Sequence, residues 1–285
     1  MRPTDIVVGT DGSTAGTYAV RWAAHQAART GARLRIVCVY HWHLPGPGTS
    51  ASQLDAAARE QAAAVAATAV ADARGVRPAI DVQGSAVLGM PTEALLTEAG
   101  TAALLVVGSH GRGALASALL GSVGLDMATN AACPVAVVRG RAHTAIGPVV
   151  AGIDDTPASD RVLATAFDEA YRRGCGLVAV RTVGADAHAA APVPAAAATT
   201  GLRTLVAVEV TEAVARMQGR YPTVPVEVEL ATGNAADVLV AASRSAQLLV
   251  LDGHGHLGVL GPALDPVTQH LLQRSDCPVL VLRDA

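Results

Sequence analysis

The stretch "ALLVVGSHGRGALASALLGSV", residues 103–123, contains the pattern that decides the fold. It opens with the uninterrupted apolar run "ALLVVG", which is typical of a strand buried on both faces of a sheet. A loop with several glycines follows, and a helical pattern begins at Gly121-Ser122. A buried strand, a glycine-rich loop and a helix in this order predict one unit of a parallel α/β sheet.

The chain contains this stretch twice, because its two halves repeat each other. Three pairs of segments match: "IVVGTDGS" (6–13) with "VVAGIDDT" (149–156), "ALLVVGSHG" (103–111) with "QLLVLDGHG" (247–255), and "ACPVAVVRG" (132–140) with "DCPVLVLRD" (276–284). The offset stays at 143 to 144 residues, which indicates a duplicated domain rather than a solenoid. We therefore expect two domains, residues 1–141 and residues 147–285, joined by the short linker "GRAHTAIGP".

Each half alternates between strand and helix patterns, which predicts a doubly wound five-stranded parallel sheet flanked by helices. In the first half we expect strands near 5–10, 33–40, 79–84, 103–108 and 134–139. The helices between them should cover about 14–30, 53–74, a short segment from Pro91, and the segment from Gly121 to about 132. The second half follows the same order, and its segment 185–200 is expected to be a loop. The fifth strand of each half is apolar and lies at an edge, so we expect the halves to pair there as a pseudo-dimer. A homodimer is left open.

Composition excludes several classes of function. The net charge is −3 and only 2% of the 285 residues are aromatic, so neither nucleic acid nor an anionic membrane is an expected partner. All 21 basic residues are arginine, which excludes a Walker-A lysine and a Schiff-base lysine. No apolar run is long enough to cross a membrane, and the first strand pattern begins too early for a signal peptide. We expect a cytoplasmic protein whose four cysteines are buried thiols.

The carboxyl ends of the first and fourth strands should form a ligand site, because open parallel sheets bind ligands where the strand order reverses. Gly108 and Gly111 allow close backbone approach and can adopt positive φ. The helix beginning at Gly121-Ser122 offers unpaired N–H groups to phosphate, and Arg112 can add a guanidinium group. Asp11 can accept a hydrogen bond from a ribose hydroxyl. Together these features indicate a nucleotide site.

The spacing Gly108-x2-Gly111-x9-Gly121-Ser122, with Asp11 after the first strand and "CPV" before the fifth, resembles the universal stress protein family over nearly the whole chain. The resemblance implies an ATP-binding stress or regulatory protein that is often dimeric. It implies that ATP, alone or with Mg²⁺, is bound by Thr10, Asp11, Val39, Val107, Gly108, Ser109, His110, Gly111, Gly121, Ser122 and Val123. To this set we add Arg112, because of its guanidinium group.

The second half departs from this motif. Asp252 stands at the position of Gly108, Asp265 at Gly121 and Pro266 at Ser122. Asp265 would cap its helix and repel phosphate, and with Asp252 it should make this crevice acidic. We expect ATP in the first half and weak or no binding in the second.

Several alternatives stay open from the residues alone. Asp11 could simply cap the first helix, and "HWH" (41–43) or Asp252 with His254 and His256 could suggest a metal, although no metal site is expected. No catalytic residues are assigned. A slow ATPase, a cAMP-binding protein and a scaffold in which the nucleotide site is incidental remain the alternatives to a nucleotide-dependent regulator.

Overall fold

The computed structural model describes residues 4–41, 51–111, 120–142, 146–183, 197–253 and 264–283. In the first half the elements are β1 (Ile6–Gly9), α1 (Thr14–Thr30), β2 (Leu34–Tyr40), α2 (Ala51–Val76), β3 (Val82–Leu88), α3 (Pro91–Ala99), β4 (Leu104–Gly108), α4 (Ser122–Asn130) and β5 (Val135–Val138). In the second half they are β6 (Val149–Gly152), α5 (Ala158–Arg173), β7 (Leu177–Thr182), α6 (Ala197–Gln218), β8 (Val226–Ala231), α7 (Ala235–Ser243), β9 (Leu248–Asp252), α8 (Pro266–Arg274) and β10 (Val279–Leu282).

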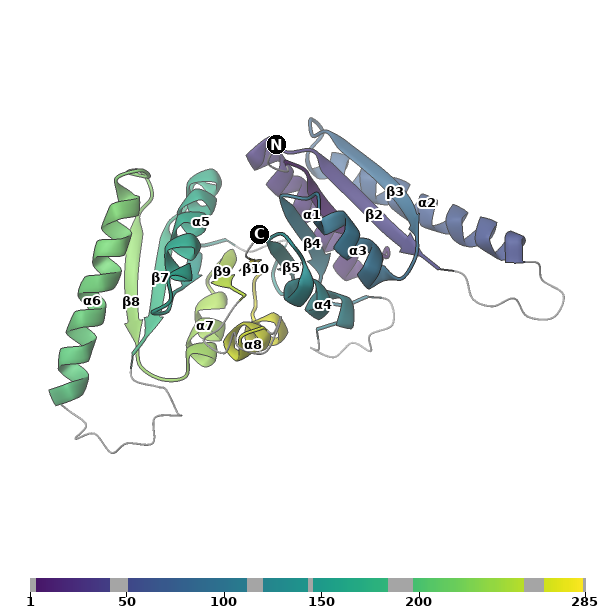
Figure 1. Ribbon diagram of the computed structural model, residues 1–285. Helices are drawn as coiled ribbons and strands as arrows, with labels where there is room; N and C mark the ends of the chain where they lie inside the picture. The colour runs from purple at the N-terminus through teal and green to yellow at the C-terminus, as the bar shows by residue number, and fades with distance from the viewer. Residues whose placement is uncertain are drawn as a thin grey trace.

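The strands of both halves form one sheet of ten in the order β3-β2-β1-β4-β5-β10-β9-β6-β7-β8. Every pairing within a half is parallel, which confirms the doubly wound α/β prediction. The two halves meet where β5 pairs with β10 in antiparallel orientation, with Val137 opposite Val279 and Val135 opposite Val281. Figure 1 shows these two strands side by side at the centre of the molecule.

The core lies on both faces of this sheet. On one face, buried strand residues pack with α1 and α2 in the first half and with α5 and α6 in the second half, and the helix residues include Trp22, Leu163 and Phe167. On the other face, α3, α4, α7 and α8 contribute residues such as Leu95, Met127 and Leu271. The strands are apolar on both sides because helices cover both sides.

The structure corrects two predicted elements. The third strand covers Val82–Leu88 rather than 79–84, and Ile80 lies in a turn where its N–H donates to Arg77 O (3.4 Å). This strand is at the edge of the sheet, so its exposed residues need not be apolar, and the apolar pattern was a poor guide to its bounds. Helix α6 begins at Ala197, inside the predicted loop 185–200, because alanine strongly favours helix. Residues 184–196 lie outside the described ranges.

The cysteines are free thiols, and three of the four are buried. Burial raises the pKa of Cys133 to about 11 and the pKa of Cys277 to about 12. Cys175 is only partly buried, contrary to expectation.

Within the described ranges, none of the helices combines the length and the apolar character needed to cross a bilayer.

Candidate functional site

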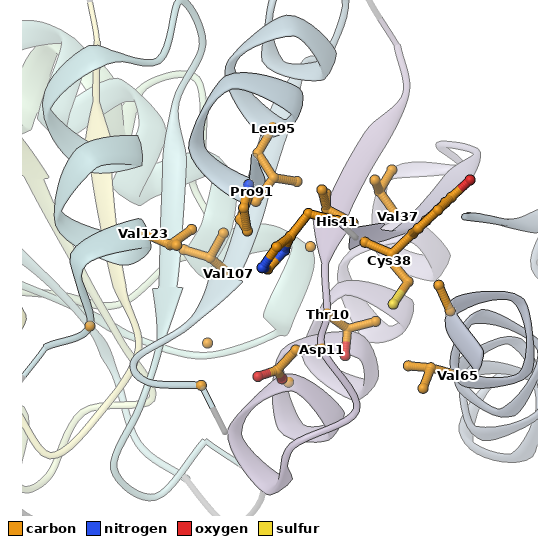
Figure 2. A pocket seen from close by; sticks show the side chains of 18 of the residues that line it. Thr10, Asp11, Val37, Cys38, His41, Val65, Pro91, Leu95, Val107 and Val123 are labelled. Atoms are coloured by element: carbon orange, nitrogen blue, oxygen red, sulfur yellow. The ribbon is translucent and has the colours of Figure 1, made fainter. Parts of the chain in front are cut away.

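A cavity of about 780 Å³ opens at the carboxyl ends of β1, β2 and β4, between α2 and α3. Figure 2 shows this cavity from close by. Ten of the twelve predicted site residues line it: Thr10, Asp11, Val39, Val107, Gly108, His110, Gly111, Gly121, Ser122 and Val123. Ser109 is instead buried behind the loop, where its hydroxyl contacts His110 Nδ1 at 3.0 Å. Arg112 lies outside the described residues. The tertiary structure therefore brings segments about 100 residues apart to one place.

The turn after β1 orients the Asp11 carboxylate. Asp11 Oδ1 accepts a hydrogen bond from the Ser13 N–H (2.9 Å), and the Thr10 hydroxyl accepts one from the Gly12 N–H (3.2 Å). Gly12 has a φ of 76°, which favours glycine. The N-cap of α1 is Ser13, whose hydroxyl accepts from the Gly16 N–H (3.1 Å). The alternative that Asp11 caps this helix is therefore wrong.

The motif glycines lie in close contacts, and neither adopts a backbone conformation that favours glycine. A Cβ on Gly111 would lie 2.8 Å from Asp11 Oδ2, and a Cβ on Gly108 would lie 2.9 Å from backbone atoms of Ala15. Neither glycine has a positive φ, which corrects the expectation from sequence. The absence of these side chains lets the loop after β4 pack directly against the turn after β1 and the start of α1.

The first turn of α4 borders the cavity. Its N-cap is Gly121, which has no side chain to accept a hydrogen bond from the helix, and Gly121 N–H itself donates to Ser109 O (2.7 Å). Ser122 is the first helical residue and is exposed, so it lies one position beyond the cap. The N–H groups of a first helical turn have no acceptor within the helix and carry the positive end of its dipole. This end of α4 is therefore suited to an anion.

Other residues of the cavity wall were not predicted from sequence. They include Cys38, Tyr40 and His41 at the end of β2, Ala58, Gln61, Ala62 and Val65 on α2, and Pro91 and Leu95 on α3. Figure 2 shows the His41 ring pointing into the space beside Pro91 and Val107. The sequence predicted Pro91 only as a helix start and "HWH" only as a possible metal-binding pattern. The wall from α2 gives no signal in sequence, because this alanine-rich helix has no distinct apolar face.

The corresponding crevice of the second half is built differently. Asp265 caps α8, and its Oδ2 accepts hydrogen bonds from the N–H groups of Val267 (3.0 Å) and Thr268 (3.2 Å). Pro266 occupies the first turn and has no N–H to offer. The prediction of a capped helix is therefore confirmed.

The expectation of an acidic second crevice needs a correction, because Arg161 on α5 pairs with Asp252 at 2.7 Å. The Asp252 side chain is only 10% exposed, so this pair partly offsets its charge in a largely buried position. The first-half counterpart of Arg161 is Tyr18, at the offset of 143 residues. A sequence comparison of the two halves could have detected this change, since Arg161 and Asp252 are both new to the second half. His254 and His256 lie outside the described residues.

Comparison with known proteins agrees with the repeated architecture. The universal stress protein family matches residues 4–139 and again 146–283. Universal stress protein Rv2005c of Mycobacterium tuberculosis is 34% identical over 296 residues, which cover 98% of this chain and 97% of that protein. A crystal structure of a universal stress protein from Archaeoglobus fulgidus has the same fold over 100% of both chains, with a TM-score of 0.76 at 16% identity.

A crystal structure of a universal stress protein in complex with cAMP aligns with 49% of this chain and 99% of that chain, at 29% identity and a TM-score of 0.39. The family match in both halves and the full-length identity to the mycobacterial protein confirm the resemblance inferred from the glycine motif. The chain is therefore a member of the universal stress protein family with two tandem domains.

Proposed function

We propose that the first half binds ATP in the cavity between β1 and β4, and that the protein acts as a nucleotide-dependent regulator rather than as an efficient catalyst. The observation that carries this proposal is the contrast between α4 and α8. The helix α4 begins at an uncapped glycine beside the cavity, whereas the first turn of α8 is capped by its own aspartate.

The phosphate groups would lie at the start of α4. There Gly121, Ser122 and Val123 of the first turn line the cavity together with Gly111. Oriented N–H groups at a helix start bind phosphate without requiring a lysine, which this chain lacks. The Asp11 carboxylate lies beside Gly111 and would repel a phosphate group there. We therefore assign it to the hydroxyl groups of the ribose.

The base would lie at the apolar end of the cavity. Val39 and Val107 come from the ends of β2 and β4, Ala62 and Val65 from α2, and Leu95 from α3. The cavity volume of about 780 Å³ is within the usual range for small-molecule sites. A flat apolar base and an anionic tail match the two ends of this cavity.

The second half would bind no ATP. The Asp265 carboxylate occupies the N–H donors that phosphate would need, and like charges about 4 Å apart cost roughly 1 to 4 kcal/mol at partly solvated dielectric values. We propose domains at 1–141 and 147–285, with the second acting as a partner of the first in a pseudo-dimer through β5 and β10. The four free cysteines support a reducing compartment such as the cytoplasm.

Calorimetric titration of the full chain with ATP, ADP and cAMP tests this proposal. We expect one ATP per chain and at least tenfold weaker ATP binding in Gly121→Asp/Ser122→Pro, which copies the start of α8. This variant should fold, because a Cβ on Gly121 would lie 3.5 Å from its nearest neighbour and proline is tolerated in a first turn. Gly121→Ala is the matched control, since it adds the Cβ without the charge.

The titration also separates the alternatives. Unchanged ATP affinity in the aspartate-proline variant would place the site elsewhere. Tighter binding of cAMP than of ATP would replace the proposed ligand. If none of the three nucleotides binds the wild-type chain, the nucleotide proposal fails. ATP turnover above that of the aspartate-proline variant would favour a slow ATPase.

A further inference from the structure

Two arginines cross between the halves at equivalent positions. Arg139 follows β5 in the first half, and its Nη1 donates to Leu272 O (2.7 Å) and Leu271 O (3.3 Å) in α8 of the second half. Arg283 follows β10 in the second half, and its Nη2 donates to Thr129 O (2.5 Å) in α4 of the first half. Each half therefore supplies a cation to a helix of the other half.

The antiparallel pairing of β5 with β10 explains this exchange. It places the carboxyl end of each strand beside the beginning of the other, where α4 or α8 has just ended. The carbonyl groups of a last helical turn have no donor within the helix and carry the negative end of its dipole. A guanidinium group at this place satisfies these carbonyls and stabilises the helix end.

The two contacts are symmetric, but the helices that they hold are not equivalent. The other end of α4 borders the cavity through Gly121 and Ser122, and α4 is only nine residues long. The other end of α8 is already capped by Asp265. Arg283 therefore contacts α4, the helix that would bind phosphate. Arg139 contacts α8, whose first turn is capped by Asp265.

Arg283 also lies against the crevice loop of its own half. A Cβ on Gly253 would lie 2.9 Å from Arg283 Nη1, so the missing side chain of Gly253 makes room for the guanidinium group. Gly253 is the counterpart of Ser109 and directly follows Asp252, which pairs with Arg161. One side chain thus touches both the crevice loop of the second half and the end of α4.

We propose that Arg283 is a positioning residue for the nucleotide site of the first half and that it couples this site to the second half. This inference rests on the proposed function. Arg283 holds the last turn of α4, and thereby fixes the direction in which the first-turn N–H groups point. A cation at the C-terminus and a phosphate at the N-terminus of one short helix both stabilise its ordered state, so the binding of each favours the other.

Calorimetric titration of three full-length variants with ATP tests the coupling. Arg283→Met keeps the apolar stem and removes the donors, and we expect about fivefold weaker binding. Arg139→Met is the matched control, because it removes the symmetric contact on α8, and its ATP affinity should equal that of the wild type. Arg283→Lys keeps the charge, and its ATP affinity should lie close to that of the wild type.

The proposal is overturned if Arg283→Met binds ATP within twofold of the wild type. It is also overturned if Arg139→Met loses as much affinity, since the effect would then be a general weakening of the junction. Should Arg283→Met fail to fold, Arg283→Gln replaces it with the same expected loss.

Amide hydrogen exchange without nucleotide separates this inference from the proposed function. In Arg283→Met exchange should rise in α4 and not in α8, and in Arg139→Met it should rise in α8 and not in α4. If the wild-type chain binds no nucleotide, the proposed function fails and this crossed pattern alone decides whether Arg283 orders α4. Equal exchange of α4 in the wild type and in Arg283→Met would overturn the inference.

Discussion

Gln26 and Glu169 occupy equivalent positions in α1 and α5, 143 residues apart, and they hydrogen-bond to each other, with Gln26 Nε2 donating to Glu169 Oε1. Arg173 completes the contact: its Nε donates to Glu169 Oε2 (3.0 Å) and its Nη2 to Gln26 Oε1 (3.0 Å). The side chains of Arg173 and Glu169 are only 3% and 8% exposed. The duplicated helices thus meet through one amide and one carboxylate, and two carboxylates at these positions could not hydrogen-bond in this way.

This pair predicts that the charges at positions 26 and 169 affect the stability of the contact between the two halves. Gln26→Glu would place a second carboxylate beside Glu169 in a buried site with one arginine between them, and we expect a loss of about 2 kcal/mol in the free energy of unfolding. The exchanged variant Gln26→Glu/Glu169→Gln restores one amide and one carboxylate and should recover at least half of this loss. Denaturant unfolding of the wild type and these variants measures both effects. An exchanged variant as unstable as Gln26→Glu would contradict the explanation.

The second crevice should gain ATP binding when its motif is rebuilt. In Asp252→Gly/Asp265→Gly/Pro266→Ser the capping carboxylate is removed, the N–H donors of α8 become accessible, and Arg161 remains as a cation beside the site. We expect the stoichiometry to rise from one ATP towards two per chain in a calorimetric titration. Asp265→Asn is a useful control, because it keeps the cap and removes the charge. Two ATP molecules bound by the wild-type chain would show that the repulsion argument is wrong.

Two glycines of the motif should give different phenotypes when a methyl group is added. Gly111→Ala would push the Asp11 carboxylate, a side chain that can move, so we expect weaker ATP binding at nearly unchanged stability. Gly108→Ala would instead press on the backbone of Ala15, and we expect a loss of about 1 to 3 kcal/mol in stability. Thermal unfolding and ATP titration of both variants distinguish these outcomes. Equal loss of stability in the two would contradict the assignment.

Alkaline pH should destabilise the protein through its buried thiols. The pKa of Cys133 is raised to about 11 and that of Cys277 to about 12 because both are buried, against an ordinary value of 9.0. A raised pKa in the folded state means that the unfolded state loses its protons first. The contribution of these two thiols to the free energy of unfolding is therefore fully present below pH 9. It is lost as the pH rises towards 11 and 12. The expected loss is about 1.4 kcal/mol per thiol for each pH unit above 9.

Denaturant unfolding at pH 8 and pH 10 checks this dependence on pH. Cys133→Ala/Cys277→Ala should be less stable than the wild type at pH 8, because packing is lost, but its stability should decline less between the two pH values. An equally steep decline in this variant would assign the alkaline effect to other groups.

Sequence alone determined the fold, the duplication and the part of the cavity wall that the motif loops form. These features depend on short local patterns: apolar strand runs such as "ALLVVG", helix starts such as Gly121-Ser122 and Asp265-Pro266, and the rule that parallel strands end at one edge. The predicted bounds of β3 were wrong, because an edge strand exposes polar residues and loses its apolar pattern.

Only the tertiary structure decided which residues far apart in the sequence meet. The pairs Gln26 with Glu169, Arg161 with Asp252, and Arg283 with Thr129 join residues 91 to 154 positions apart. The packing of α2 against the cavity was decided in the same way. The physical reason is that such contacts depend on strand order, on the antiparallel junction of β5 with β10 and on the direction of each side chain, and none of these is encoded in a local pattern of residues.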